Sequence, residues 1–247
     1  MAVVFPQSRR WLRKPLGRNG TTNMDDVTLY LGDCLDILPT LGKVDAIVTD
    51  PPYGVAMIRG DSKVRAGIFG DDGIVDVRWM ADYPAIIWGG NNFCDQLPRS
   101  TGWLVWYKYF PDMAQHSQAE LAWTNVVRTI RHHSEAYHGF MRQRDGWFHP
   151  TQKPIGLMRW CIELCRLPPK AIILDPYMGS GTVGIAAVEL GYRFIGIEID
   201  PTYYAIAQRR IAEAQLQPPL LPNHGFHLTS SGGALQLNFI ETGAGEP

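Results

Sequence analysis

Residues 171–200 read AIILDPYMGSGTVGIAAVELGYRFIGIEID. This stretch predicts, in order, a short buried strand, a glycine-rich turn, an apolar helix and a second strand. Gly179, Gly181 and Gly184 follow the first strand with the spacing G-x-G-x-x-G, which lets a chain turn tightly from a strand into a helix. A unit of this kind predicts an α/β fold with parallel strands.

The same alternation of strands and helices runs through the rest of the chain. Asp200 and Pro201 are typical of a helix start, because aspartate caps the first turn and proline suits the first helical position. The alternation predicts a Rossmann-like α/β domain, in which a mostly parallel sheet carries helices on both faces. The expected strands are 27–31, 44–49, 85–88, 102–108, 171–174 and 193–199, with a further apolar stretch in 118–127, and the expected helices are 34–41, 155–167, 181–190 and 201–214.

The 247 residues suit one large domain, which we expect to span residues 24–216. Residues 1–23 contain several arginines and no acidic residue, and they predict a flexible basic arm. An arginine-rich, acid-poor start is also typical of organellar transit peptides, which is a minor alternative. Residues 217–247 are rich in proline, glycine and serine and predict a tail, in which 234–240 could pair as an edge strand.

Composition excludes several classes of protein. The chain is 45% hydrophobic and 19% charged, which is ordinary for a globular protein. No apolar stretch approaches the ~20 residues of a membrane span, so no membrane partner is expected. Four scattered cysteines favour reduced thiols, and we expect a cytoplasmic protein encoded by a bacterium or a phage.

Local charge points to a polyanionic partner, although the net charge is only −1. The basic arm is one local excess of cations. The second lies in residues 128–159, where six basic side chains face two acidic ones. Such segments in a nearly neutral protein indicate a directed surface for a polyanion, and solvated loops are the alternative.

The glycine turn has an acidic partner further along the chain. Glu198 lies 19 residues beyond Gly179, at the tip of the next strand. Glycines let a ligand approach the backbone, and an acid in this position binds ribose hydroxyls. The pattern favours an adenosine-containing ligand; a nicotinamide dinucleotide or a purely structural turn would fit the same spacing.

A second motif, Asp50-Pro51-Pro52-Tyr53, follows the strand expected at 44–49. Proline fixes φ, lacks a backbone donor and forces the preceding residue into an extended conformation. The four residues therefore predict a stiff, acceptor-rich pocket with one flat ring, which suits a planar amine. A proline-stiffened turn is the structural alternative.

Together these motifs resemble the S-adenosylmethionine-dependent DNA amino-methyltransferases, which methylate adenine N6 or cytosine N4. Asp50 to Tyr53 is similar to their catalytic motif, and Asp175 to Thr182 is similar to their cofactor motif, with Tyr177 where phenylalanine is commoner. His149 to Pro154 is similar to a third segment, and the order of the motifs is that of the β group. The resemblance covers about residues 26–214 and implies a class I methyltransferase fold.

The resemblance also implies roles for individual residues. Asp50 and the Pro51 carbonyl accept the two hydrogens of the target amine, and Tyr53 stacks on the base. The catalytic residues are Asp50, Pro51, Pro52 and Tyr53. The residues that bind S-adenosylmethionine are Asp33, Asp50, Thr151, Gln152, Lys153, Asp175, Pro176, Tyr177, Gly179, Ser180, Gly181, Thr182 and Glu198. Residues 128–148 form a short DNA-recognition segment whose DNA contacts are Arg128, Arg131, Arg142 and Arg144.

Several functional alternatives stay open at this point. The aspartate form of the catalytic motif favours adenine N6, and cytosine N4 is the alternative. An RNA or protein-amide methyltransferase, a non-catalytic DNA-binding module and a dinucleotide oxidoreductase are further hypotheses. The short recognition segment suggests either a short target site or help from a second subunit, and we expect a homodimer. Cys161 and Cys165 stand four residues apart with no second pair at zinc-ligand spacing, so we expect no metal. The target site and the biological role are left open.

Overall fold

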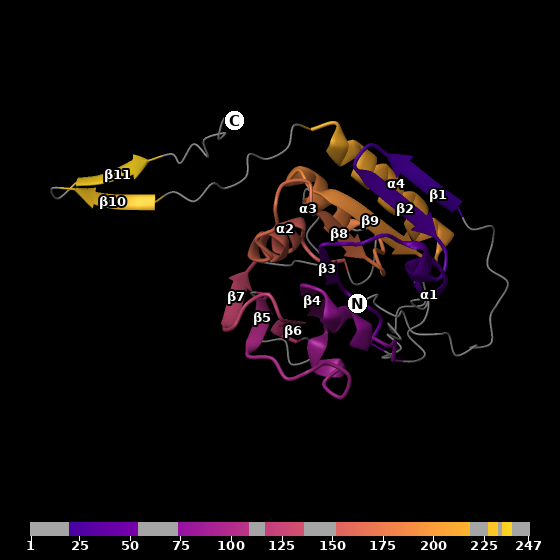
Figure 1. Ribbon diagram of the computed structural model, residues 1–247, viewed down its shortest axis with the longest axis horizontal. Coiled ribbons are helices and arrows are strands. Elements are labelled where there is room, and N and C mark those ends of the chain that lie inside the picture. Colours follow the sequence, from indigo (N-terminus) through magenta and orange to yellow (C-terminus); the bar gives the residue numbers. More distant parts are fainter. Residues whose placement is uncertain are drawn as a thin grey trace.

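A nine-stranded mixed sheet forms the centre of the protein in the computed structural model, which describes residues 20–53, 74–108, 117–135, 152–217, 227–231 and 234–238 (Figure 1). The strand order is β1-β2-β9-β8-β3-β4-β6-β5-β7. The strands are β1 (Gly20–Met24), β2 (Val27–Leu31), β3 (Ala46–Thr49), β4 (Ala85–Trp88), β5 (Gly102–Tyr107), β6 (Ala119–Thr124), β7 (Ile130–Ser134), β8 (Ile172–Asp175) and β9 (Arg193–Glu198).

The central strands β2, β9, β8, β3 and β4 are mutually parallel, as the alternation of strands and helices predicts. Strand β6 runs antiparallel to both β4 and β5, and β7 runs parallel to β5. From β8 the chain continues outward to β9, whereas from β3 it continues in the opposite direction to β4. The carboxyl ends of β8 and β3 therefore flank a topological switch point, where open α/β sheets bind their ligands.

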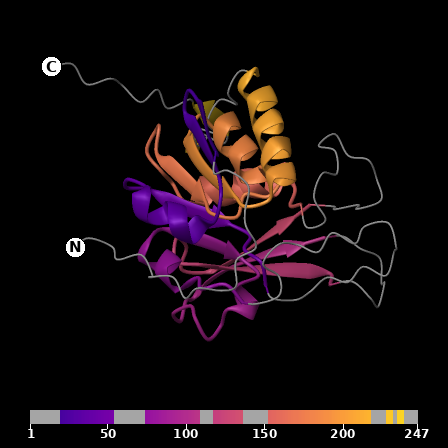
Figure 2. The ribbon, with the colours of Figure 1, turned by 90° about the vertical axis from the view of Figure 1, so that its right-hand side faces the viewer.

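Helices cover both faces of the sheet, and alternate strand residues pack on each layer. Val48 and Ile173 belong to the cluster that packs on one helical layer, and Ile47 and Leu174 to the cluster on the other. Figure 2 shows α3 and α4 in orange on the side of the sheet opposite α1 in indigo. One layer contains α2 (Ile155–Leu164), α3 (Thr182–Glu189) and α4 (Pro201–Gln215); the other contains α1 (Cys34–Ile37) and the 3₁₀ turns Leu38–Thr40, Arg78–Asp82 and Gly90–Asn92.

Two strands of the sheet were not predicted. Residues 20–23, assigned to the basic arm, belong to β1, which forms a hairpin with β2 through Asp25 at φ +43°. Strand β7 lies within 128–148, where the sequence has no apolar alternation. Both are edge strands with largely exposed or half-buried side chains, so neither carries the apolar pattern that marks a buried strand.

The segment expected to be a tail holds a hairpin. Strand β11 (Ala234–Asn238) pairs antiparallel with β10 (His227–Ser231) in a separate two-stranded sheet, and not with the edge of the main sheet. Within the described residues, no helix combines the length and the apolarity that crossing a bilayer requires.

Candidate active site

The segment that the sequence predicts to be catalytic, residues 50–53, follows β3 directly at the switch point, and we call it the catalytic rim after that prediction. Pro51 is buried and Tyr53 is half-buried. The Tyr53 hydroxyl donates a hydrogen bond to Asp50 Oδ1, and its ring meets that of Phe93 edge to face at a centroid distance of 6.2 Å. A Cβ at Gly89, just after β4, would lie 2.0 Å from the Tyr53 ring, so only glycine leaves room for this ring position.

The carboxylate of the catalytic rim is the last member of a row of four charged side chains, which we call the charge chain: Lys108, Glu120, Lys153 and Asp50. Lys153 Nζ lies 2.5 Å from Asp50 Oδ2 and 3.0 Å from Glu120 Oε2. Lys108, just after β5, pairs with the other Glu120 oxygen. The charges alternate in sign along the row, so each one is compensated by a neighbour.

Burial and ion pairing act against each other in the charge chain. Burial raises the pKa of Asp50 above its usual range, and Lys153 opposes that effect. Burial would also raise the pKa of Glu120, but the two lysines outweigh it and lower that pKa to about 2. Burial would lower the pKa of Lys153, but Asp50 and Glu120 raise it well above its usual range. Lys153 therefore carries its proton at neutral pH.

The glycine turn, residues 175–182, connects β8 to α3 beside the catalytic rim. Gly179 and Gly181 have φ values of +51° and +83°, a region that disfavours other residues. A Cβ at Gly181 would lie 3.0 Å from that of Ala207 on α4, so the turn packs tightly on this helix. The sequence pattern correctly predicts a strand, a turn and a helix here.

Glu198, at the end of β9, is bound to the glycine turn through the backbone. Its Oε2 accepts a hydrogen bond from Gly179 N at 2.8 Å, and its Oε1 accepts from Ile199 N and Asp200 N at 2.9 and 2.8 Å. Burial raises the pKa of Glu198, although these backbone donors oppose the effect. The carboxylate that the sequence assigns to a ribose is thus held next to the turn.

Asp175 joins the two sides of the switch point. Its Oδ1 accepts from Thr49 Oγ1 on β3 at 2.8 Å and from Tyr177 N at 3.1 Å. Burial raises the pKa of Asp175 to about 7 despite these donors. This aspartate fixes the glycine turn to the strand that carries the catalytic rim.

A buried arginine that sequence reasoning missed supports the glycine turn from the other side. Arg210 on α4 donates from Nη1 to Ser180 O at 2.7 Å and to Ser180 Oγ at 3.0 Å. Ser180 Oγ in turn donates to Gln152 Oε1 at 3.3 Å. Arg210 follows Ala207 by three residues on the buried face of α4, and this helical spacing was the available signal.

One cavity unites the three motifs. The catalytic rim contributes Asp50 to its lining, and the segment before α2 contributes Gln152 and Lys153. The glycine turn supplies much of the remaining lining. The structure therefore brings together the three distant segments that the sequence predicts to share one site. The full lining is Asp50, Gln152, Lys153, Met158, Asp175, Tyr177, Met178, Gly179, Ser180, Thr182 and Val183.

Other predicted site residues lie outside this cavity or outside the described residues. Asp33 caps α1, with its Oδ1 2.9 Å from Leu35 N, and it is close enough to Tyr177 to affect that residue's pKa. Arg128 and Arg131 are exposed, the latter on β7. Thr151, Arg142 and Arg144 lie outside the described residues. Within those residues, no three His, Cys, Asp or Glu side chains gather where they could hold a metal ion.

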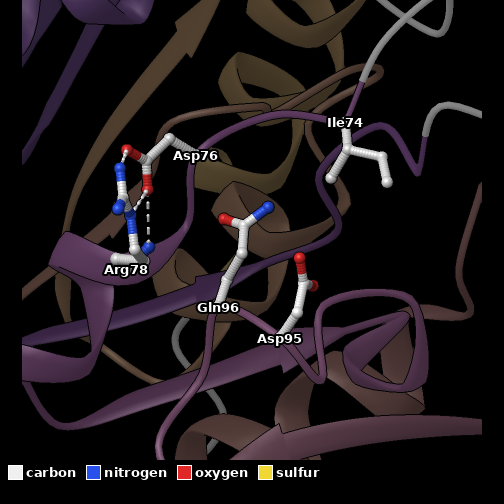
Figure 3. A pocket seen from close by; sticks show the side chains of 5 residues that line it. All are labelled: Ile74, Asp76, Arg78, Asp95 and Gln96. Carbon is white, nitrogen blue, oxygen red and sulfur yellow. Dashed lines mark hydrogen bonds and ion pairs between the residues drawn. The ribbon is translucent and has the colours of Figure 1, made fainter.

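A second hollow of about 270 Å³ is lined by Ile74, Asp76, Arg78, Asp95 and Gln96 and contains none of the predicted site residues (Figure 3). Asp76 pairs with Arg78 inside it at 2.6 Å. Gln96 Oε1 accepts from Val77 N, and Gln96 Nε2 donates to Val75 O. Gln96 thus ties its turn to the backbone of residues 75–77, which gives this hollow a structural role.

Comparison with known proteins agrees with the geometry. Residues 105–209 match the DNA methylase family of N6 and N4 methyltransferases. The candidate methylase YubD of Escherichia coli (strain K12) is 27% identical over 209 residues, which cover 74% of this chain and 89% of that protein. The DNA adenine methyltransferase YhdJ of the same organism is 46% identical over 63 residues, 26% of this chain and 21% of that protein.

A solved structure confirms the fold. The cytosine-N4-specific PvuII DNA methyltransferase superposes with a TM-score of 0.51 at 13% identity, covering 82% of this chain and 95% of that chain. The order of the motifs, the shared cavity and the match over residues 105–209 agree with one another: the chain is similar to the S-adenosylmethionine-dependent DNA amino-methyltransferases.

Proposed function

We propose that this chain methylates the exocyclic N6 amine of adenine in DNA. The observation that carries the proposal is the cavity that Asp50 and Lys153 line together with the glycine turn. A carboxylate suited to an amine and a turn suited to an adenosine-containing ligand share one space. Methyl transfer requires this arrangement, because donor and acceptor must lie in line within one site.

The residues around the cavity fit the cofactor. Gly179 and Gly181 present backbone without side chains, and Glu198 is held beside them with oxygens that can still accept hydrogen bonds. Glu198 would bind the ribose hydroxyls and Tyr177 would lie beside the adenine. Gln152, Ser180 and Thr182 would face the methionine end. S-adenosylmethionine, when bound, supplies a methyl group on a sulfonium centre.

The catalytic rim would orient the amine. The lone pair of an exocyclic amine is delocalised into the base, so the amine is a weak nucleophile. Asp50 and the Pro51 carbonyl would accept its two hydrogens and aim the lone pair into the cavity. Alignment of this kind can lower a barrier by about 7–11 kcal/mol. Asp50 Oδ1 is bonded to the Tyr53 hydroxyl, so Tyr53 would release this oxygen as its ring moves onto the base.

Adenine is favoured over cytosine by two observations. The first residue of the catalytic rim is aspartate, the form that the resemblance associates with adenine. The stretch shared with YhdJ, a protein named as a DNA adenine methyltransferase, also has the highest identity among the relatives described above. Methylation of cytosine N4 is the second candidate, because its amine presents the same two hydrogens.

Access to the amine in a duplex requires that the base leave the stack. Arg128 and Arg131 are exposed and could contact phosphates on the way to the cavity, as could Arg142 and Arg144. The proposed partner is therefore DNA, and a homodimer would extend the short recognition segment.

The two E. coli relatives support a bacterial or phage origin.

The test uses S-adenosylmethionine with a tritiated methyl group and, separately, unmethylated DNA, RNA and protein. Label should enter DNA, and nucleoside mass spectrometry should identify N6-methyladenine. Asp50→Ala should abolish labelling, and Asp82→Ala, which removes an exposed aspartate that belongs neither to the charge chain nor to the cavity lining, should not. N4-methylcytosine would transfer the proposal to the second candidate, and label in RNA or protein alone would overturn both.

A further inference from the structure

The charge chain extends the catalytic rim into the body of the protein. Its four members come from separate elements of the fold: Asp50 follows β3, Lys108 follows β5, Glu120 lies on β6 and Lys153 precedes α2. Their side chains are 20%, 14%, 27% and 7% exposed, in that order. Taking four charges partly out of water costs free energy, and pairing them with one another does little more than offset that cost. Stability alone therefore does not explain the charge chain, and its arrangement points to a function.

We propose that Lys153 is a positioning residue that keeps Asp50 an ionised hydrogen-bond acceptor, and that Glu120 limits this effect by sharing the same ammonium group. The inference rests on the proposed function, because it assigns to Asp50 the task of receiving the target amine. It changes the role that the sequence suggests for Lys153. The carboxylates that this cation contacts are Asp50 and Glu120 of the protein itself.

Lys153 is held firmly enough to act in this way. Its ammonium contacts two carboxylates and lies 5.9 Å from the centre of the Trp88 ring. Pro154 follows it and restricts its backbone to extended conformations. Gln152, on its other side, is bonded to Ser180 of the glycine turn. The same short segment thus fixes the cation beside Asp50 and touches the cofactor side of the cavity.

The state of Asp50 matters because a protonated carboxyl has a donor where the amine needs an acceptor. The groups that face Asp50 are Lys153, Glu120, Tyr53 and Asp175. Burial favours the protonated form, Lys153 opposes it, and Glu120 adds to it. Lys153 is the one cation among the described groups that face Asp50. Without it, Asp50 should stay protonated up to a higher pH.

The two neighbours of Asp50 therefore predict shifts of opposite sign. Lys153→Met removes the compensating cation and should raise the pKa of Asp50. Glu120→Gln removes a nearby anion and should lower it, while Lys153, whose pKa lies well above its usual range, stays protonated. A purely structural role would damage the site in both variants and would not produce opposite shifts.

The experiment follows the Asp50 carboxyl by carbon-13 NMR in full-length protein labelled at the aspartate carboxyl carbons, with Asp50→Asn to assign the signal. Relative to wild type, the titration should move to higher pH in Lys153→Met, by about one unit or more, and to lower pH in Glu120→Gln. Lys153→Arg should titrate near wild type. Lys170→Met is the matched control, since it breaks an exposed lysine–aspartate pair of the same 2.5 Å length.

The same variants are then assayed for methylation of unmethylated DNA against pH. The acidic limb of kcat/KM should follow each NMR titration, so activity of Lys153→Met at a fixed pH falls about tenfold for each unit of displacement above that pH. Equal titrations in Lys153→Met and wild type, or shifts of the same sign in both variants, would overturn the inference. If Lys153→Met does not fold, the comparison of Lys153→Arg, Glu120→Gln and wild type decides it.

Failure of the inference and failure of the proposed function are distinguishable. Opposite NMR shifts in a protein that methylates no DNA would overturn the proposed function and leave the charge relation between Lys153 and Asp50 supported. DNA methylation with unshifted titrations would do the reverse.

Discussion

The catalytic rim and the glycine turn lie side by side at the switch point, yet they are stabilised by different means. Asp50 is held by two side chains: the Lys153 ammonium, which is distant in sequence, and the Tyr53 hydroxyl from the rim itself. Glu198 is held by three backbone N–H groups. Changes in the rim should therefore alter chemistry and leave cofactor binding intact, whereas changes in the turn should do the opposite.

The largest expected effect is a loss of turnover when the catalytic rim is changed. Asp50→Ala should reduce turnover by at least about 100-fold, because the amine loses a preorganised acceptor. The dissociation constant of S-adenosylmethionine, measured by isothermal titration calorimetry, should change little. A comparable loss of cofactor affinity would show that the two regions are not separable.

The second effect separates them at the turn. Gly181→Ala places a Cβ 3.0 Å from Ala207 at φ +83°, and should weaken cofactor binding by about tenfold. Gly191→Ala is the matched control, since its φ of +75° gives the same strain but its Cβ would meet nothing within 4 Å. Both variants should lose stability in thermal melts, and only Gly181→Ala should lose affinity. Equal affinities in calorimetry would contradict the assignment of the turn.

A smaller effect is expected from the support of the turn. Arg210→Met removes two buried hydrogen bonds to Ser180 and should lower the free energy of unfolding by about 1–3 kcal/mol. Cofactor affinity should fall several-fold, because Ser180 is released, while the acidic limb of the pH profile stays in place. A shifted limb would mean that Arg210 acts on the rim.

The smallest effect concerns the link between the regions. Burial raises the pKa of Asp175 to about 7, above its usual value of about 4, so the folded state holds a proton that the unfolded state has lost between these values. This contribution to stability is present at low pH and is lost as pH rises toward 7. Asp175→Asn mimics the protonated form and keeps an acceptor for Thr49. The free energy of unfolding of this variant minus that of the wild type, both from urea unfolding, should rise by at most about 1.4 kcal/mol per pH unit. A difference that stays flat or falls from pH 4 to 7 would contradict the raised pKa of Asp175.

Much of the sheet, the catalytic rim and the glycine turn could be predicted because each leaves a local signal. Buried strands such as β4 leave apolar runs, and the glycine turn leaves fixed spacings. Strand β7 left none, since an exposed edge strand with the sequence Ile130–Ser134 does not need apolar alternation. Glu120 and Arg210 were missed for another reason: their roles depend on partners distant in sequence, which only the fold brings together.

The most direct test of the shared cavity is a crystal structure of the chain with S-adenosylhomocysteine. The ligand should bind between the glycine turn and Asp50, with its ribose on Glu198 and its sulfur facing the catalytic rim. Binding at another place, such as the hollow beside Asp76 and Arg78, would contradict the claim that donor and acceptor meet at the switch point.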